Sequence, residues 1–413
     1  MKKIISILVI TGLLFGLTGT ITAQEKTIDI FISMPEYATA INQLIDAYQK
    51  IEPDVKINYQ TIQSDYPTLL KVKLNSGDVP DIFASAPGKE IDLYKEYSYD
   101  LSGQPLVDAM QPAIKKVMAD SSGEGVYGLA IKGNYFGLIY NKDLFAQAGI
   151  EQAPATMSEL ETAITKLEEA GITPFTSGFG EWWVYKHVFQ HFLAATTNNP
   201  AALIKKFENG EANLKDYPIL YNNFFHFVDL VSEHGDAKPL EATLNTEIAN
   251  FSTGKAAMMV GQGPWVEDSL DQIDPNLKIG FVGYPVSDNP AQAQVISGAD
   301  QALRISRNSD NLETVLDFVN WWYTSDYGQN WFVNVAGVVP PVKMDYQSDY
   351  DIIKGAKQSV AAKGAGQLTI IYSTDSFHMA FAEAMQAYVG NTIDKDQACK
   401  LIENNWVKVD GSN

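Results

Sequence analysis

The sequence predicts an α/β protein in which helices cover the faces of a parallel sheet, arranged in two domains. Strand-like and helix-like segments alternate from residue 27 to residue 84, as in a parallel sheet with crossover helices. The chain has 413 residues, of which 46% are hydrophobic, and this length fits two domains or one very large one. The single cysteine, Cys399, has no partner for an internal disulfide, so a large apolar core must stabilise the fold.

The N-terminus has the layout of a secretory signal peptide. Lys2 and Lys3 give a short positive start, residues 4–17 are largely apolar, and small and polar residues follow up to Ala23. We therefore predict that residues 1–23 are a signal peptide and that the mature chain is exported, to a periplasmic or extracellular location. A membrane anchor is the alternative, but the apolar run is shorter than the roughly 20 residues that a spanning helix needs. The lack of a cysteine near the cleavage site argues against a lipid anchor.

The first sheet is predicted from three strand-like segments separated by two helices. Apolar residues alternate in residues 27–32 and 55–59, which indicates two strands. A short apolar segment at residues 80–84 indicates a third, buried strand. Between these strands, residues 38–48 and 66–74 carry apolar side chains at helical spacing. Because this order joins neighbouring strands through helices, we expect the strands to be parallel.

The alternation continues through the rest of the chain. Thr156 and Glu159 form a capping-box pattern that opens a helix. An amphipathic helix is predicted over residues 312–322, and we assign its Trp321 and Trp322 to the core. Further strands are predicted at residues 126–131, 136–140, 278–282 and 301–305. Because no repeat, low-complexity tract or Pro-rich linker interrupts the sequence, we expect short strands to connect the domains.

The charge balance excludes some classes of ligand. The formal net charge is −20. Such a surface repels nucleic acid and anionic lipid, because binding either of them requires Lys and Arg to neutralise phosphates. We therefore expect no nucleic-acid partner, and a neutral or cationic solute suits the acidic surface better.

Five stretches, in order along the chain, carry the motifs of a known family. Residues 70–83 read Leu-x-x-x-Leu-x-Ser-Gly-x-x-Pro-Asp-Ile-Phe, and residues 140–149 read Tyr-Asn-Lys-Asp-Leu-Phe followed by Ala-Gly. Residues 251–265 contain Gly-Lys-Ala-Ala-Met and Gly-Pro-Trp, and the helix at residues 316–331 precedes Gly-Val-Val-Pro at residues 337–340. By these motifs the chain resembles extracellular solute-binding protein family 1 of bacterial ABC importers, in the branch that binds maltose-like and raffinose-like sugars.

The resemblance implies a two-lobed periplasmic-binding-protein fold of type II, an α/β fold with the ligand in a cleft between lobes joined by hinge strands. The N-terminal lobe would comprise residues 24–131 plus 297–340, and the C-terminal lobe residues 132–296 plus 341–413. The implied ligand is a carbohydrate, and the implied partners are the membrane subunits of an ABC importer. The resemblance also implies a monomer that is not an enzyme and has no catalytic residue, cofactor or metal.

A sugar presents apolar C–H faces and a rim of hydroxyls, so its site needs flat aromatic rings and hydrogen-bonding side chains. Trp182 and Trp183, which follow glycines in the sequence, are candidate rings, and the resemblance adds Trp265. Acids and their neighbours near predicted strand ends and crossovers are the other candidates, together with Phe377, where the family places a further aromatic. These additional candidates are Glu36, Tyr37, Asp81, Asn134, Tyr135, Asp300, Asp375 and Phe377.

We predict that the protein binds an oligosaccharide, such as an α-galactoside, and delivers it to an importer by closure of the lobes. One alternative is an exported glycoside hydrolase, which needs two carboxylates beside the scissile bond, although the sequence shows no recognisable catalytic motif. Another is a binding subunit that reports sugar to a membrane receptor. His187 and His191 share a helix face, but with no obvious third ligand we expect a structural pair and no zinc site.

Overall fold

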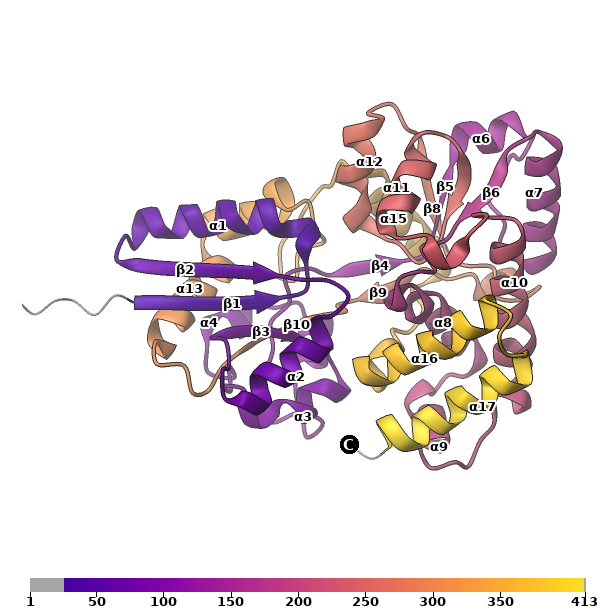
Figure 1. Ribbon diagram of the computed structural model, residues 1–413. Coiled ribbons are helices and arrows are strands. Elements are labelled where there is room, and N and C mark those ends of the chain that lie inside the picture. The colour runs from indigo at the N-terminus through magenta and orange to yellow at the C-terminus, as the bar shows by residue number, and fades with distance from the viewer. Residues whose placement is uncertain (1–25, 412–413) are drawn as a thin grey trace, which may run out of the picture.

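The computed structural model describes residues 26–411, which form two α/β lobes joined by strands (Figure 1). The predicted two-lobed type II fold is confirmed. The signal peptide predicted for residues 1–23 lies outside the described residues. Across residues 26–411, the structure contains no helix long and apolar enough to cross a bilayer.

The first lobe is built on a four-stranded sheet in the order β10-β3-β1-β2. Its elements are β1 (Lys26–Ile32), α1 (Ala38–Ile51), β2 (Val55–Thr61), α2 (Tyr66–Ser76), β3 (Ile82–Ser85) and β10 (Ala302–Ile305). As the sequence predicted, β1 is parallel to both β2 and β3. Gly77 ends α2 with a φ of 81°, a left-handed conformation that a residue without a Cβ adopts at little cost. β10 pairs antiparallel with β3 and is contributed by a segment more than 200 residues later.

Further helices enclose the core of the first lobe. They are α3 (Lys89–Leu93), α4 (Pro105–Ala109), α5 (Pro112–Met118), α13 (Leu312–Thr324) and α14 (Asp326–Asn330). The core assignment of Trp322 is confirmed, because it is buried beside Phe318 and Trp331. Trp321 is only partly buried and packs against Tyr48.

Two antiparallel strands, β4 (Asn134–Phe136) and β9 (Ile296–Gly298), connect the lobes (Figure 1). The chain crosses between the lobes a third time next to these strands, where Val339 pairs with Gly133. Beyond it, Val342 still packs in the core of the first lobe. We therefore propose that the chain leaves the first lobe after Met344, a few residues later than the boundary at residue 340 expected from the resemblance.

The second lobe has a sheet in the order β6-β7-β5-β8. Its strands are β5 (Leu138–Asn141), β6 (Thr173–Thr176), β7 (Ala256–Met259) and β8 (Ile279–Val282). Its helices are α6 (Lys142–Gln147), α7 (Met157–Glu169), α8 (Trp182–Thr196), α9 (Pro200–Glu208), α10 (Phe225–Glu233), α11 (Leu244–Ser252), α12 (Glu267–Ile273), α15 (Asp351–Lys363), α16 (Asp375–Val389) and α17 (Lys395–Asn405). The capping box of α7 is confirmed: Thr156 accepts from the Glu159 N–H, and Glu159 accepts from the Thr156 N–H.

Two strand predictions differ from the structure. Residues 126–131 form only isolated bridges, since Val126 pairs with Ala119 and Leu129 with Leu303. The predicted strand at residues 136–140 is divided at Gly137, because β4 pairs with β9 between the lobes while β5 joins the sheet of the second lobe. A Cβ on Gly137 would lie 2.4 Å from the carbonyl oxygen of Val282, so a glycine is required at this change of direction.

Candidate functional site

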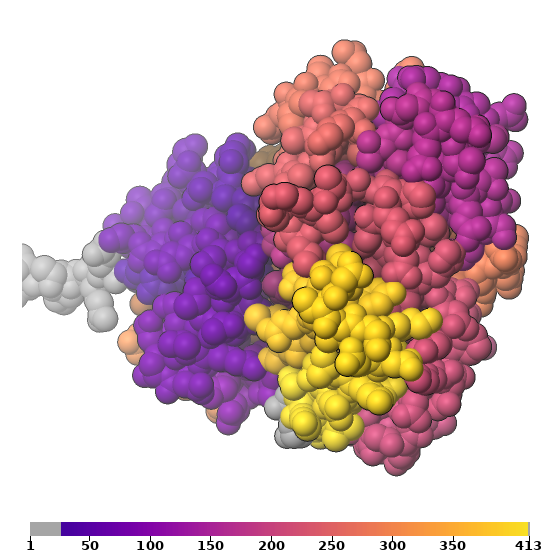
Figure 2. Space-filling view, turned by 45° about the vertical axis from the view of Figure 1, so that its right-hand side comes forward, coloured from indigo at the N-terminus to yellow at the C-terminus, as the bar shows by residue number. Residues whose placement is uncertain are grey.

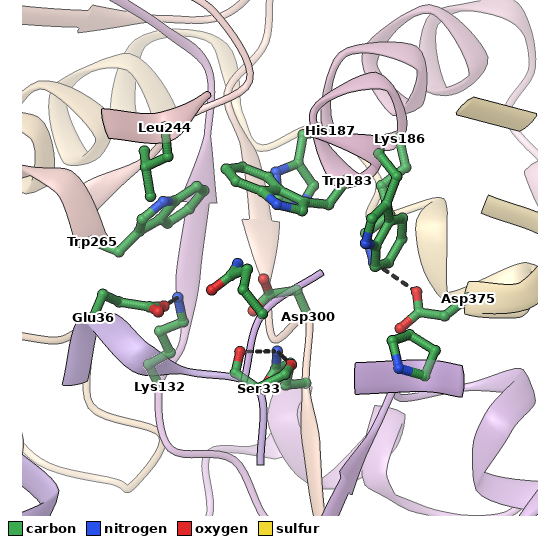
Figure 3. A pocket seen from close by; sticks show the side chains of 14 residues that line it. Ser33, Glu36, Lys132, Trp183, Lys186, His187, Leu244, Trp265, Asp300 and Asp375 are labelled. Carbon is green, nitrogen blue, oxygen red and sulfur yellow. Dashed lines mark hydrogen bonds and ion pairs between the residues drawn. The ribbon is translucent and has the colours of Figure 1, made fainter. Parts of the chain in front are cut away.

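A pocket of about 640 Å³, including the part open to solvent, lies where the two lobes meet. Figure 2 shows the N-terminal lobe, in indigo and purple, against the second lobe with its yellow C-terminal helices. Fourteen side chains line the pocket, ten of them labelled in Figure 3. They are Ser33, Glu36, Gln63, Pro67, Lys132, Trp182, Trp183, Lys186, His187, Leu244, Trp265, Asp300, Gln301 and Asp375.

The first lobe and the connecting strands contribute mainly polar side chains. Ser33 and Glu36 follow β1 directly, and Gln63 follows β2, so all three lie past the carboxyl ends of parallel strands. This edge of an α/β sheet is where such folds generally bind ligands. Lys132 precedes β4, and Asp300 follows β9.

The second lobe contributes the aromatic side chains. Trp182, Trp183 and His187 lie on α8, and Trp265 lies in the 3-10 helix Pro264–Val266. Trp182 and Trp183 are the first two residues of α8. Figure 3 shows Trp265 and Trp183 facing Glu36, Lys132 and Asp300 across the pocket. The two lobes thus present different chemistry to whatever lies between them.

The ring of Trp265 is held in a fixed orientation. Its Nε1 donates to Oε1 of Gln262 at 3.0 Å, and the Gln262 amide donates to the carboxyl of Glu247. Gln262 and Glu247 are fully buried. The ammonium of Lys132 lies 4.6 Å from the centre of the Trp265 ring. Because its N–H is already used, Trp265 offers a ligand the surface of its ring and not a donor.

Trp182 and Trp183 differ from Trp265 in this respect. Within the part of the chain that the structure describes, both indole N–H groups are buried and have no hydrogen-bond partner. Trp183 packs against His187 with ring centres 5.4 Å apart, and Nζ of Lys186 lies 4.7 Å from the Trp182 ring. An unpaired buried N–H costs free energy, so these two indoles are donors in need of an acceptor.

Asp300 and Gln301 offer the complementary acceptors. Gln301 Nε2 donates to Ser33 Oγ at 2.8 Å, but its Oε1 has no partner among residues 26–411, and neither has Oδ1 of Asp300. Burial acts to raise the pKa of Asp300, but the nearby positive charge, Lys132 first, outweighs it, and the net pKa lies below the ordinary value. Asp300 is therefore an ionised acceptor at neutral pH.

The other charged groups of the pocket are partly balanced. Lys132 Nζ lies 3.9 Å from Oε1 of Glu36, and burial raises the pKa of Glu36 in spite of this lysine. Lys186 Nζ lies 2.7 Å from Oδ1 of Asp375. Burial lowers the pKa of His187 to about 3, so this imidazole is neutral. Two ammonium groups thus face three carboxyl groups, one of which has a raised pKa.

The lobes also touch each other directly. Ser64 Oγ of the first lobe donates to Glu181 Oε2 of the second at 2.9 Å. Lys71 Nζ of the first lobe donates to Ser376 Oγ at the start of α16 at 2.5 Å. These two bonds join the lobes directly, as expected of a closed arrangement of the lobes.

Six of the eleven predicted site residues line this pocket. They are Glu36, Trp182, Trp183, Trp265, Asp300 and Asp375. Tyr37, Asn134 and Tyr135 lie beside it without lining it: Tyr37 and Asn134 are buried, and Tyr135 is partly buried in β4.

The expectations for Asp81 and Phe377 are corrected. Asp81 precedes β3, so it lies at the amino end of that strand and away from the ligand-binding edge of the sheet. Its carboxylate accepts from the Asp29 N–H at 2.8 Å and from the Ser309 hydroxyl. Phe377 is 1% exposed and stacks on Trp406 inside the second lobe.

Sequence reasoning missed several lining residues. Lys186 and His187 follow Trp182 and Trp183 by one helical turn, so i, i+4 spacing would have brought them to the same face of α8. Lys132, Gln63 and Leu244 carried no such local signal. His191 is buried against Tyr284, and residues 26–411 contain no cluster of three His, Cys, Asp or Glu side chains placed to hold a metal.

Comparisons with known proteins agree with this architecture. The profile of the family described as bacterial extracellular solute-binding protein matches residues 32–329. The multiple sugar-binding protein of Streptococcus mutans is 22% identical over 316 residues, which are 75% of this chain and 74% of that protein. The melibiose/raffinose/stachyose-binding protein MelE of Bacillus subtilis is 22% identical over 306 residues, 71% of this chain and 70% of MelE.

Solved structures share the fold. The crystal structure of a sugar transporter from Bacillus licheniformis in complex with stachyose matches with a TM-score of 0.79 at 18% identity, over 92% of this chain and 99% of that chain. The family profile covers well over half of the chain and spans the carboxyl end of β1, both hinge strands and α13. The chain therefore belongs to the bacterial extracellular solute-binding protein family.

Proposed function

We propose that this protein captures a neutral oligosaccharide of the α-galactoside class outside the cytoplasm and delivers it to an ABC importer. One observation carries the proposal: the pocket holds both unpaired donors and unpaired acceptors. The donors are the indole N–H groups of Trp182 and Trp183, and the acceptors are Asp300 Oδ1 and Gln301 Oε1. A hydroxyl group both donates and accepts, so a ligand with many hydroxyls satisfies both kinds of group.

The remaining features of the pocket support the same ligand class. The ring of Trp265 provides an apolar surface for the C–H face of a pyranose. The near balance between ammonium and carboxyl groups favours a ligand without net charge. The relatives named above for sugars, one of them for melibiose, raffinose and stachyose, support the choice of an α-galactoside.

The proposed mechanism requires no covalent chemistry. The ligand contacts polar groups of one lobe and aromatic groups of the other only when the cleft is closed. It therefore shifts the population of the protein towards the closed arrangement, which the membrane subunits of the importer recognise. The importer partnership is supported by the family, and we further propose that the chain works as a monomer.

The proposal is tested by a thermal-shift screen of the purified mature chain with raffinose, stachyose, melibiose, maltotriose and xylotriose. A sugar present at about 100 times its Kd stabilises the folded protein by about 2.7 kcal/mol, which is a clear rise in Tm. We expect raffinose and stachyose to give the largest rise. If none of these sugars changes Tm or the tryptophan fluorescence, the proposal is wrong.

Two further measurements separate the alternatives. Chromatography of raffinose after prolonged incubation with the protein should show no cleavage, and released galactose or sucrose would instead indicate a hydrolase. Deletion of the gene should abolish uptake of labelled raffinose. Normal uptake with a lost transcriptional response to raffinose would instead indicate a sensing subunit.

A further inference from the structure

Glu90, on α3 of the first lobe, has a buried carboxyl group that joins the two lobes. It is 3% exposed. Its Oε2 accepts from the Ala86 N–H of its own lobe at 2.8 Å. Its Oε1 accepts from the Asp375 N–H of the second lobe, at the start of α16, at 2.7 Å. One side chain thus uses both of its oxygens to connect backbone groups of opposite lobes.

The surfaces around Glu90 are closely fitted. Gly88 has a φ of +70°, and a Cβ there would lie 2.4 Å from the carbonyl oxygen of Ile371 in the second lobe. Lys89 extends the contact, because its Nζ lies 2.7 Å from Oε1 of Glu208 and donates to the carbonyl of Asp410 at 2.5 Å. The close approach at Gly88 leaves no room for a side chain between the lobes at this point.

The contact continues from Glu90 into the ligand pocket. The backbone N–H of Asp375 donates to Glu90. The carboxylate of Asp375 in turn accepts a hydrogen bond from the ammonium of Lys186 at 2.7 Å. The same ammonium lies 4.7 Å from the ring of Trp182. Asp375, Lys186 and Trp182 line the pocket, as Figure 3 shows for the first two, whereas Glu90 does not.

We propose that Glu90 is a positioning residue for ligand binding: from the first lobe it fixes the Asp375–Lys186 pair of the second lobe and favours the closed arrangement. Ligand affinity then depends on a side chain that never touches the ligand. This inference rests on the proposed function, because it concerns the affinity of the same cleft.

The surroundings of Glu90 give this role a pH dependence. Burial, and next the nearby carboxylate of Asp375, raise the pKa of Glu90 to about 7. The opposing positive charges are Lys186 of the second lobe and Arg304 of the first, whose guanidinium donates to the Glu90 carbonyl at 3.2 Å. Tyr66 and Tyr94 are further titratable neighbours of Glu90. Asp92 lies near Arg304, and His378, whose pKa burial lowers to about 4, lies near Lys186 and Asp375.

The sign of the effect follows from opening of the cleft. Opening of the cleft exposes Glu90 to water and moves the carboxylate of Asp375 away from it. Both changes favour the ionised form, so we expect the pKa of Glu90 to be lower in the open form. The closed form therefore binds the proton more tightly. The contribution of Glu90 to closure is fully present below the pKa of the open form and is lost as the pH rises through about 7. The protonated carboxyl group keeps the hydrogen bond between the lobes, because its carbonyl oxygen still accepts from the Asp375 N–H.

The chain contains a matched control in Glu267. This acid is also 3% exposed and also accepts two backbone N–H groups, from Asp351 and from Ile352. Burial raises its pKa to about 7 as well. Both of its partners lie at the start of α15 in its own lobe, so Glu267 does not connect the lobes.

The test compares wild type, Glu90→Gln and Glu267→Gln by calorimetric titration with raffinose between about pH 6 and about pH 8. We expect wild-type affinity to fall as the pH rises. Glu90→Gln should bind about three- to tenfold more weakly at about pH 6, the effect of one lost hydrogen bond, and should lose the pH dependence. Glu267→Gln should keep both the affinity and the pH profile of wild type.

Small-angle scattering of the ligand-free proteins gives a readout that needs no sugar. We expect a larger radius of gyration for Glu90→Gln than for wild type at about pH 6. An unchanged affinity and pH profile in Glu90→Gln, or equal losses in the two variants, would overturn the inference. Wild-type affinity that is constant over this range would also overturn it, whether or not the variant folds. If raffinose does not bind wild type, the proposed α-galactoside specificity fails, and scattering alone decides the role of Glu90.

Discussion

Replacing Trp265 by alanine tests whether the cleft uses a ring to hold its ligand. An aromatic ring contributes about 0.5–1.5 kcal/mol beyond the area that it buries. If a sugar face covers about 40–60 Å² of the indole, burial adds about 1–1.5 kcal/mol at about 25 cal/mol per Å². We therefore expect Trp265→Ala to weaken sugar binding by about 1.5–3 kcal/mol, which is about 10- to 150-fold in Kd, as measured by calorimetry.

The same substitution affects the fold, so a control is needed. Trp265 packs against Phe136 and His187, and its removal should lower the free energy of unfolding by about 2 kcal/mol. Trp321 is also partly buried, and packs against Tyr48 and Tyr327 on the first lobe away from the pocket. Trp321→Ala should lose comparable stability and bind sugar normally. Wild-type affinity in Trp265→Ala, or equal loss of affinity in both variants, would refute the stacking role.

Three further predictions concern the acids and the thiol. Asp300→Asn removes an unpaired charged acceptor and should weaken binding at least about tenfold in calorimetry, and an unchanged Kd would exclude Asp300 as a ligand contact. Because burial raises the pKa of Glu267 to about 7, its contribution to stability is present at acid pH and is lost as the pH rises through about 7. The fall in Tm between about pH 5 and about pH 8 should therefore be smaller in Glu267→Gln than in wild type, and equal falls would contradict this. Cys399 is 1% exposed and burial raises its pKa to about 12, so it should react with a thiol reagent such as dithionitrobenzoate only when denaturant unfolds the chain.

The sequence predicted the elements of the fold well wherever the signal was local. The alternating isoleucines of β1, the capping box of α7 and the amphipathic pattern of α13 depend on neighbours in the sequence, and each element formed as expected. The predicted strand at residues 126–131 failed because its apolar residues pack in the core without a continuous partner strand. Apolar alternation indicates burial, but only a partner strand makes a sheet.

The candidate site was predictable where chemistry and chain position coincided. Glu36 follows the carboxyl end of β1, and flat indole rings suit a sugar ligand, so the sequence reasoning selected residues that line the pocket. Asp81 is the same type of residue as Asp300, but it stands at the amino end of its strand, and the direction of the strand excludes it from the cleft. Phe377 was misplaced because sequence does not show which face of α16 turns inward.

By itself, the sequence determined the two-lobed α/β class, the acidic surface and the supply of rings and carboxylates. Only the tertiary structure decided which of these groups meet. Glu90 and Asp375 are 285 positions apart, yet they share a hydrogen bond across the cleft. Such a contact depends on the packing of two separately formed lobes, and no pattern of neighbouring residues specifies that packing.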